Sequence, residues 1–149
     1  YVDSFKALGA NAVPMAWTEV LTALQQGTVD GQENPLNVIM AFKLYDIQKH
    51  LSITRHAYAP AAILMSLATW KKLNSAQQGI VKKAAQDAAE FERAWDNKME
   101  SEWLKDLEAK GMTVTKPDLK PFLAAVKPVY EQYTPKYGKN LLDSIMNTK

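Results

Sequence analysis

The side chains best suited to binding a small ligand lie between residues 13 and 35. Trp17 offers a flat apolar surface, and the Asn34 amide offers hydrogen-bond donors together with an acceptor. Pro14 precedes the tryptophan and turns the chain, because it cannot donate to a strand ladder. This combination predicts a binding edge. The structural alternative makes Trp17 a core aromatic and Asn34 with Pro35 the cap of the next helix.

A second chemical feature is the segment from Arg55 to Tyr58. His56 and Tyr58 are two residues apart, so in an extended chain they would present an imidazole and a phenol to one surface. By spacing alone, a structural histidine explains the pair better than a ligand-binding one does.

Hydrophobic spacing predicts the elements that position these side chains. Apolar residues at three-to-four spacing predict a helix over 18–26, which Gly27 ends. We expect short strands at 12–13 and 28–29, and a turn at 30–31. In α/β units, ligands bind where turns leave the carboxyl ends of strands, which places the candidate residues at one edge.

The rest of the chain alternates between helical and strand-like patterns. Such alternation indicates an α/β fold. The expected helices span 1–8, 35–45, 75–110, 118–133 and 138–146, and the further strands span 51–54, 61–65 and 112–115.

The expected helix over 75–110 is long for the size of the chain. One apolar stripe runs along it: Ile80, Ala84, Ala88, Phe91, Trp95, Met99, Trp103 and Leu107. About 35 residues at 1.5 Å each give about 52 Å, whereas a compact domain of this length is about 40 Å across. Either the helix kinks onto its own chain, or its stripe needs a partner. We expect self-association through a second copy.

Composition excludes several classes of protein. The 149 residues and 47% hydrophobic content suit one globular domain, and a net charge of +2 without a basic run gives no nucleic-acid surface. There is no cysteine for disulfides or thiolate chemistry. No apolar run reaches the roughly 18 residues of a membrane span.

Enzymatic patterns are also missing from the sequence. The two histidines form no metal-binding motif, and no nucleophile elbow, phosphate loop or dinucleotide fingerprint occurs. Glu19, Asp30 and Glu33 could imitate an acid/base pair. Glu19 is better explained by the helix dipole and Asp30 by its turn. We therefore expect no catalysis, cofactor or metal.

Two runs carry a family resemblance: ALGANAVPMAWTEVLTALQQGTVDGQENP and KLYDIQKHLSITRHAY. They resemble the DctP-type solute receptors of tripartite ATP-independent periplasmic (TRAP) transporters, and the resemblance extends through all 149 residues. It implies an α/β fold that forms one lobe of a two-lobed, periplasmic-binding-protein-like receptor. Residues 1–65 would face the ligand, 66–111 would form a long lobe-spanning helix, and 112–149 would add the last strand and helices. The chain starts at Tyr1 without a methionine, so we expect the C-terminal half, with the first lobe absent.

The resemblance also implies a function. A periplasmic receptor of this family captures a small organic acid and delivers it to the TRAP membrane permease subunits. The ligand-binding positions would be Trp17, Asn34, Pro14, His56 and Tyr58. The family clamps the ligand carboxylate with an arginine of the first lobe, so this chain alone should bind weakly. Trp17 stands where the family often has phenylalanine, which narrows the pocket. The alternative is a protein-interaction module with no small-molecule ligand, built on the long helix.

Overall fold

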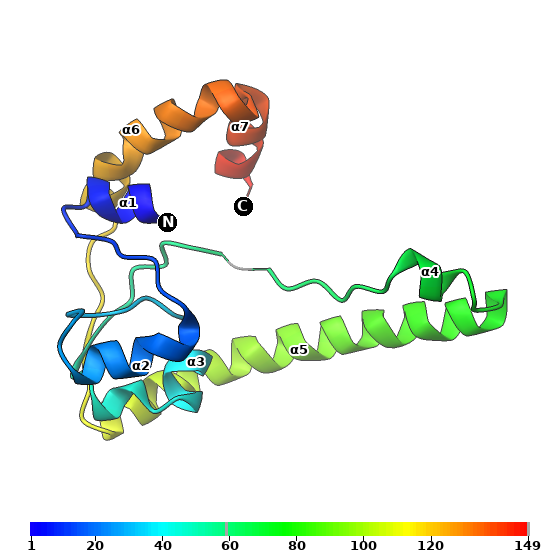
Figure 1. The fold of residues 1–149 in the computed structure, drawn as a ribbon, viewed down its shortest axis with the longest axis horizontal. Helices are drawn as coiled ribbons and strands as arrows, with labels where there is room; N and C mark the ends of the chain where they lie inside the picture. Colours follow the sequence, from blue (N-terminus) through cyan, green and yellow to red (C-terminus); the bar gives the residue numbers. More distant parts are fainter. Residues whose placement is uncertain (59, 149) are drawn as a thin grey trace. The chain divides into compact units, whose positions relative to one another are not determined.

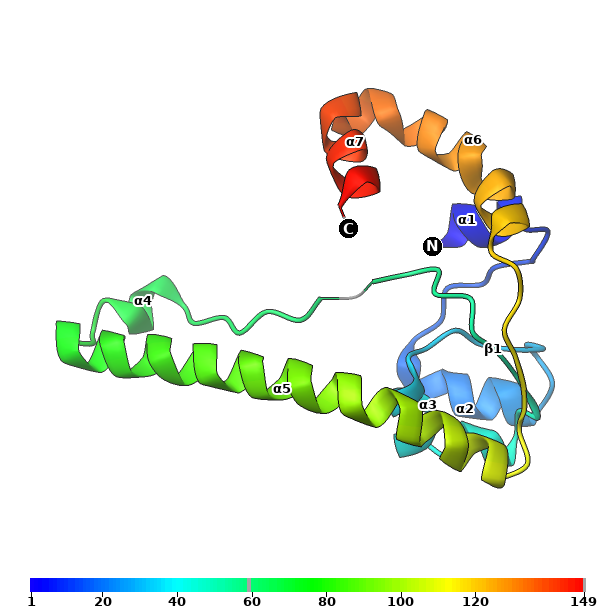
Figure 2. The same ribbon diagram turned by 180° about the vertical axis from the view of Figure 1, so that it is seen from behind.

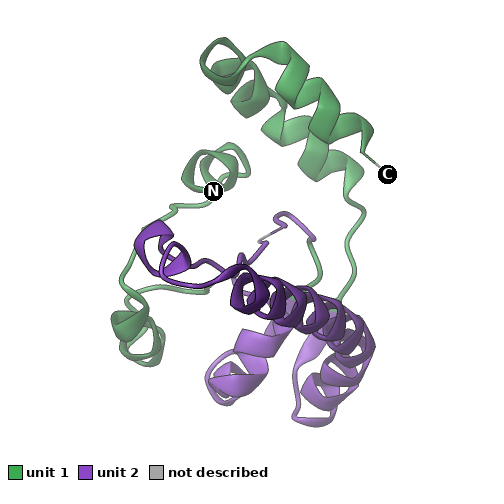
Figure 3. Cartoon of the chain, turned by 90° about the vertical axis from the view of Figure 1, so that its right-hand side faces the viewer, with its two compact units in different colours: residues 1–32, 52–54, 115–149 green, residues 33–51, 55–114 purple. Residues whose placement is uncertain are grey.

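The computed structural model describes residues 1–58 and 60–148. Contacts divide the chain into two compact units, shown in Figure 3. Unit 1 comprises residues 1–32, 52–54 and 115–149, and unit 2 comprises 33–51 and 55–114. The elements in chain order are α1 (Val2–Ala7), α2 (Trp17–Gln25), α3 (Leu36–Ala41), the 3₁₀ helix η1 (Leu44–Asp46), β1 (His50–Ser52), α4 (Leu67–Trp70), α5 (Ser75–Ala109), β2 (Thr113–Thr115), α6 (Lys120–Tyr137) and α7 (Lys139–Asn147) (Figures 1 and 2).

Strands β1 and β2 pair as a small parallel sheet. Thr113 N donates to Lys49 O at 2.8 Å, and Ile53 N donates to Thr115 O at 2.9 Å. Parallel neighbours need a long crossover, and the connection between these strands carries α4 and α5. The strands expected at 51–54 and 112–115 are thus confirmed with shifts of one or two residues at their ends, and so is the α/β class.

Three other expected strands are wrong. Residues 12–13, 28–29 and 61–65 form no strand in the structure. Strand backbone needs a neighbouring strand to satisfy its N–H and C=O groups, and no described residues supply one to these segments. The apolar pattern of 61–65 remains visible as exposed side chains, with Ile63 67% and Leu64 87% accessible.

Helix α2 confirms the helix expected over 18–26, one residue earlier at each end. Gly27, with φ +67°, follows its C-cap as predicted. Gly27 N donates to Leu24 O at 3.2 Å and Thr28 N to Ala23 O at 2.9 Å, which is the Schellman arrangement. Because Thr28 is engaged in ending the helix, it cannot begin a strand.

The single helix expected over 35–45 is divided in two. Pro35 is the N-cap of α3 rather than part of its first turn. The left-handed Lys43 (φ +52°) then separates α3 from η1. Helix α3 packs against α5 within unit 2, and the buried residues of the two helices are Ile39 and Leu107.

Helix α5 is unbroken over its 35 residues, so the kinked alternative is wrong. Its N-cap is Asn74, one residue before the expected start of the helix. Asn74 Oδ1 accepts from Gln77 N at 2.9 Å, and Gln77 Oε1 accepts from Asn74 N at 3.0 Å, which forms a capping box. Of the apolar stripe, only Leu107 is buried, whereas Ile80, Phe91 and Trp95 are 69%, 70% and 49% exposed.

In unit 1, α6 packs against both α1 and α7. The helix does not end near residue 133 as expected but continues to Tyr137, where Gly138 (φ +87°) ends it. Tyr133 OH donates to Asp3 Oδ2 at 2.6 Å and joins α6 to α1. No helix among the described residues has the length and apolarity needed to cross a membrane.

The Tyr133–Asp3 hydrogen bond predicts a pH-dependent stability. Donation to the Asp3 carboxylate, and then its charge, raise the pKa of Tyr133 above 10.0. Because the pKa is higher in the folded state, this contribution is complete below pH 10.0 and is lost as pH rises through the folded pKa. Tyr133→Phe should therefore lower the free energy of unfolding at neutral pH, with the difference shrinking in strong alkali. Urea unfolding of both proteins across pH 7 to 11 measures this.

Tyr137→Phe is the control, since Tyr137 is 58% exposed and stacks on Tyr133. It should change stability less. A Tyr133→Phe difference that is unchanged at high pH would contradict the role of the phenol proton.

Candidate functional site

Trp17 and Pro14 lie in unit 1, around the start of α2. Trp17 is the first residue of the helix and is 36% exposed, after the extended N-cap Ala16. Pro14 is exposed in the preceding loop. Glu19 lies in the first turn, where its charge favours the helix dipole as expected. The structure thus presents a large aromatic side chain at a helix N-terminus.

Asn34, His56 and Tyr58 lie in unit 2. Asn34 is half-buried directly before Pro35, the N-cap of α3. Tyr58 is 88% exposed, and the side chain of His56 is 29% exposed. Spacing suggested that His56 and Tyr58 share one surface. Both residues are exposed, but His56 is engaged with another side chain.

That partner is Glu33, the residue before Asn34. His56 Nε2 lies 3.1 Å from Glu33 Oε2, and the glutamate side chain is 40% exposed. An ionised carboxylate can only accept, so Nε2 carries the proton and donates; in the neutral ring, Nδ1 is then the acceptor. The contact joins the 55–58 segment to the 33–35 segment, which are separated by more than twenty residues.

Backbone hydrogen bonds hold the segment that leads to His56. Beyond β1, Ile53 N donates to Thr115 O, and Thr54 N donates to Ser52 O at 3.0 Å. Arg55 then adopts a left-handed conformation with φ +45°. Nothing in the sequence indicated this turn.

Together these groups suit the recognition of a polar ligand. The Asn34 amide has donors for hydroxyl or carboxylate oxygens and one acceptor, whereas the neutral His56 imidazole, with Nε2 donating to Glu33, has only Nδ1 as an acceptor for a hydroxyl. In the described residues, no group of three or more His, Cys, Asp or Glu is placed to hold a metal ion. Sequence reasoning treated Glu33 only as an acid/base alternative, and its pairing with His56 requires the fold.

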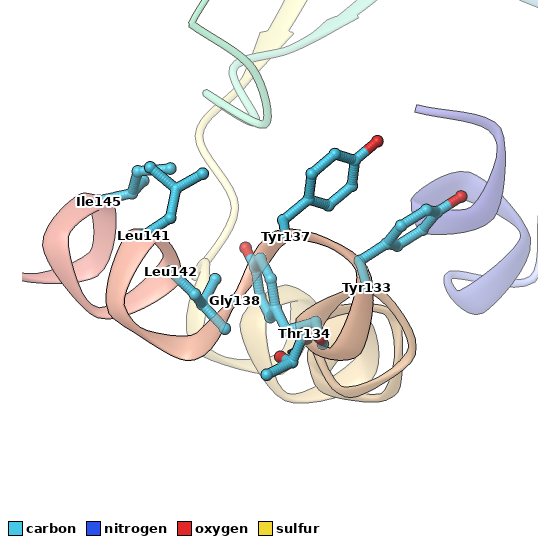
Figure 4. Close-up of a pocket in the computed structure, with 8 residues that line it drawn as sticks. Tyr133, Thr134, Tyr137, Gly138, Leu141, Leu142 and Ile145 are labelled. Atoms are coloured by element: carbon cyan, nitrogen blue, oxygen red, sulfur yellow. Dashed lines mark hydrogen bonds between the residues drawn. The ribbon is translucent and has the colours of Figure 1, made fainter.

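The surface groove of unit 1 is chemically different. It has a volume of 140 Å³ between α6 and α7 and is almost wholly apolar. Figure 4 shows Tyr137, Leu141, Leu142 and Ile145 around it, with Tyr133 reaching toward α1. None of the expected ligand-binding residues lines the groove, and we do not place the site there.

Known proteins resemble this chain over nearly its whole length. The DctP family model, described as bacterial extracellular solute-binding protein, family 7, matches residues 1–136. A solute-binding protein of Verminephrobacter eiseniae is 43% identical over 150 residues, covering 100% of this chain and 45% of the relative. The chain therefore spans about half the length of that relative.

Two solved TRAP periplasmic solute-binding proteins have the same fold. One from Polaromonas sp. JS666, bound to D-erythronate, is 40% identical with a TM-score of 0.92 over 99% of this chain and 49% of its own. One from Bordetella bronchispeptica, with pantoate assigned to its ligand density, is 44% identical with a TM-score of 0.91 over 99% and 49%. Both proteins are similar to this chain throughout unit 1 and unit 2.

Proposed function

We propose, because this chain belongs to the DctP family of bacterial extracellular solute-binding proteins, that it forms the C-terminal half of a TRAP receptor. The receptor captures a small organic acid in the periplasm and delivers it to the TRAP membrane permease subunits. The observation that carries this proposal is the match to a D-erythronate-bound receptor over 99% of the chain. The family consists of solute-binding proteins, so binding rather than catalysis is the activity to test.

The proposed ligand-binding residues are Trp17, Asn34, Pro14, His56 and Tyr58. Trp17 provides an apolar wall and Asn34 hydrogen bonds, while Pro14 shapes the loop before the tryptophan. Glu33 supports His56 at 3.1 Å and fixes its tautomer. Binding energy would select a closed arrangement of two lobes through hinge motion. An arginine from the other half would bind the carboxylate in bidentate geometry.

We further propose that an N-terminal lobe completes this half. Two groups of exposed apolar side chains in unit 2 support that view. Ile63 and Leu64 lie in extended backbone without a neighbouring strand among the described residues, and Phe91 stacks with Trp95 on the open stripe of α5. Partner surface that covers them would remove apolar area from water. Residues 1–65, 66–111 and 112–149 would then be the ligand-facing part, the lobe-spanning helix and the C-terminal elements.

A thermal-shift screen of the complete two-lobed protein tests the receptor function. The panel contains D-erythronate, pantoate, uronic acids and dicarboxylates, with the matching neutral polyols as controls. A ligand at about 100-fold above its Kd stabilises the folded protein by about 2.7 kcal/mol. We expect at least one acid, and none of the polyols, to raise the Tm. A panel without any shift would contradict the proposal and favour the interaction module.

The open stripe of α5 predicts that the 149-residue chain by itself self-associates. Size-exclusion chromatography with light scattering should show a dimer or larger species at micromolar concentration. Trp95→Gln should shift the chain toward monomer, because it removes an aromatic that is 49% exposed. Leu123→Gln, at a site 54% exposed on α6, is the control and should leave the oligomeric state unchanged. A monomeric wild-type chain would contradict self-association.

A further inference from the structure

The turn at Arg55 is an unusual piece of backbone next to the proposed ligand site. Its φ of +45° lies in the left-handed region, which glycine and asparagine tolerate and most other side chains avoid. Among the described residues, Lys43 (φ +52°) is the only other non-glycine residue with positive φ. Such a conformation persists only where the surrounding structure determines it.

The turn separates a strand from a binding segment. Strand β1 ends at Ser52, and Ile53 N still donates to Thr115 O at 2.9 Å. In a continuing strand, successive side chains would keep alternating between the two faces. A left-handed residue interrupts that alternation, so the backbone of Arg55 sets the direction in which His56 projects.

The direction of His56 matters because of what it reaches. Its Nε2 lies 3.1 Å from Glu33 Oε2, and Glu33 is covalently next to Asn34. The guanidinium of Arg55, in contrast, forms no ion pair with the described residues, and the residue is exposed. The conformation of Arg55 is therefore tied to the site more closely than its charge is.

We propose that Arg55 is a positioning residue of the ligand site and acts through its left-handed backbone, which aims His56 at Glu33 and thereby fixes the neighbouring Asn34. The inference rests on the proposed function, since it takes Asn34 to be a ligand-binding residue. It separates two roles that a single alanine substitution would confuse, the charge of the side chain and the shape of the turn.

A pair of substitutions distinguishes these roles. Arg55→Gly and Arg55→Val both remove the guanidinium, but only glycine accepts positive φ, whereas a β-branched side chain there is strongly disfavoured. Lys43→Val introduces the same conflict elsewhere in unit 2 and controls for general destabilisation. Glu33→Ala supplies the reference state in which the contact to His56 is lost.

The first readout is the imidazole ¹⁵N chemical shifts of His56 in the 149-residue chain, with His50 as internal reference. Arg55→Gly and Lys43→Val should retain the wild-type shifts of His56. Arg55→Val should move them to those of Glu33→Ala. The proposal is overturned if Gly and Val behave alike at position 55, or if Lys43→Val moves His56 as far as Arg55→Val does.

The second readout is affinity in the complete protein, measured by calorimetry. The probe is D-erythronate, or the acid that stabilises most in the screen. Arg55→Val should weaken binding by about tenfold, and Arg55→Gly should stay within about twofold of wild type. Equal affinities of the two variants overturn the positioning role while the receptor function stands. If the wild type binds no acid, the proposed function fails, and the ¹⁵N shifts still decide the role of the turn.

Discussion

Replacing Asn34 or Trp17 by alanine should remove most of the stabilisation that an organic acid gives to the complete receptor. The Asn34 amide is half-buried beside the N-cap of α3, and its loss would leave ligand oxygens without hydrogen bonds. Trp17→Ala removes an aromatic wall and the apolar area it buries. If each variant binds about 100-fold more weakly, a ligand gain of about 2.7 kcal/mol falls to about 0.4 kcal/mol.

Ligand-induced thermal shifts of wild type and variants measure this effect. Asn37→Ala is the matched amide control: Asn37 lies in α3, is exposed, and accepts a hydrogen bond from Val38 N at 2.8 Å. Trp95→Ala is the matched tryptophan control on α5. Both controls should keep the wild-type ligand shift even where they lower the Tm without ligand. A full shift in Asn34→Ala or Trp17→Ala would remove that residue from the proposed site.

Leu107→Ala should destabilise the chain by about 2–5 kcal/mol, the cost of emptying a close-packed site. Leu107 has no exposed surface and lies near the C-terminal end of α5, where α3 packs against that helix. Ile39, the buried residue of α3, is 2% exposed. Truncation at position 107 would therefore leave a cavity in the part of unit 2 where α3 packs against α5.

Urea unfolding at constant pH gives the comparison, with Leu123→Ala as the control. Leu123 is 54% exposed, so the same chemical change there should cost less than about 1 kcal/mol. Leu44→Ala, at the other fully buried leucine, should resemble Leu107→Ala. Equal losses at positions 107 and 123 would show that the α3–α5 packing contributes little to stability.

The elements predicted correctly are those whose causes are local. The ends of α2 and α5 follow from Gly27 and Gly111, because glycine accepts the positive φ that these helix ends require. The apolar spacing of α5 over 35 residues is equally local. The strand predictions failed at 12–13, 28–29 and 61–65 because a strand depends on a partner that its own residues do not specify.

The candidate site also has a part that could be predicted from the sequence and a part that depends on the fold. The resemblance carried by the runs ALGANAVPMAWTEVLTALQQGTVDGQENP and KLYDIQKHLSITRHAY implied Trp17, Asn34 and His56 as ligand-binding positions, and the chemistry of each side chain indicated which contacts it could make. The partner of His56 was not predictable, because Glu33 is remote in sequence and lies within hydrogen-bond distance only through the fold. The role of Glu33 therefore changes from a possible acid to a support for the imidazole.

The sequence by itself determined the family, the α/β class and the long helix, because residue identity and periodicity encode them directly. Only the tertiary structure decided which predicted strands find partners, which part of the α5 stripe is buried, that Arg55 is left-handed and that His56 lies against Glu33. Each of these depends on groups far apart in sequence being brought together, and their energies arise only when the packing forms.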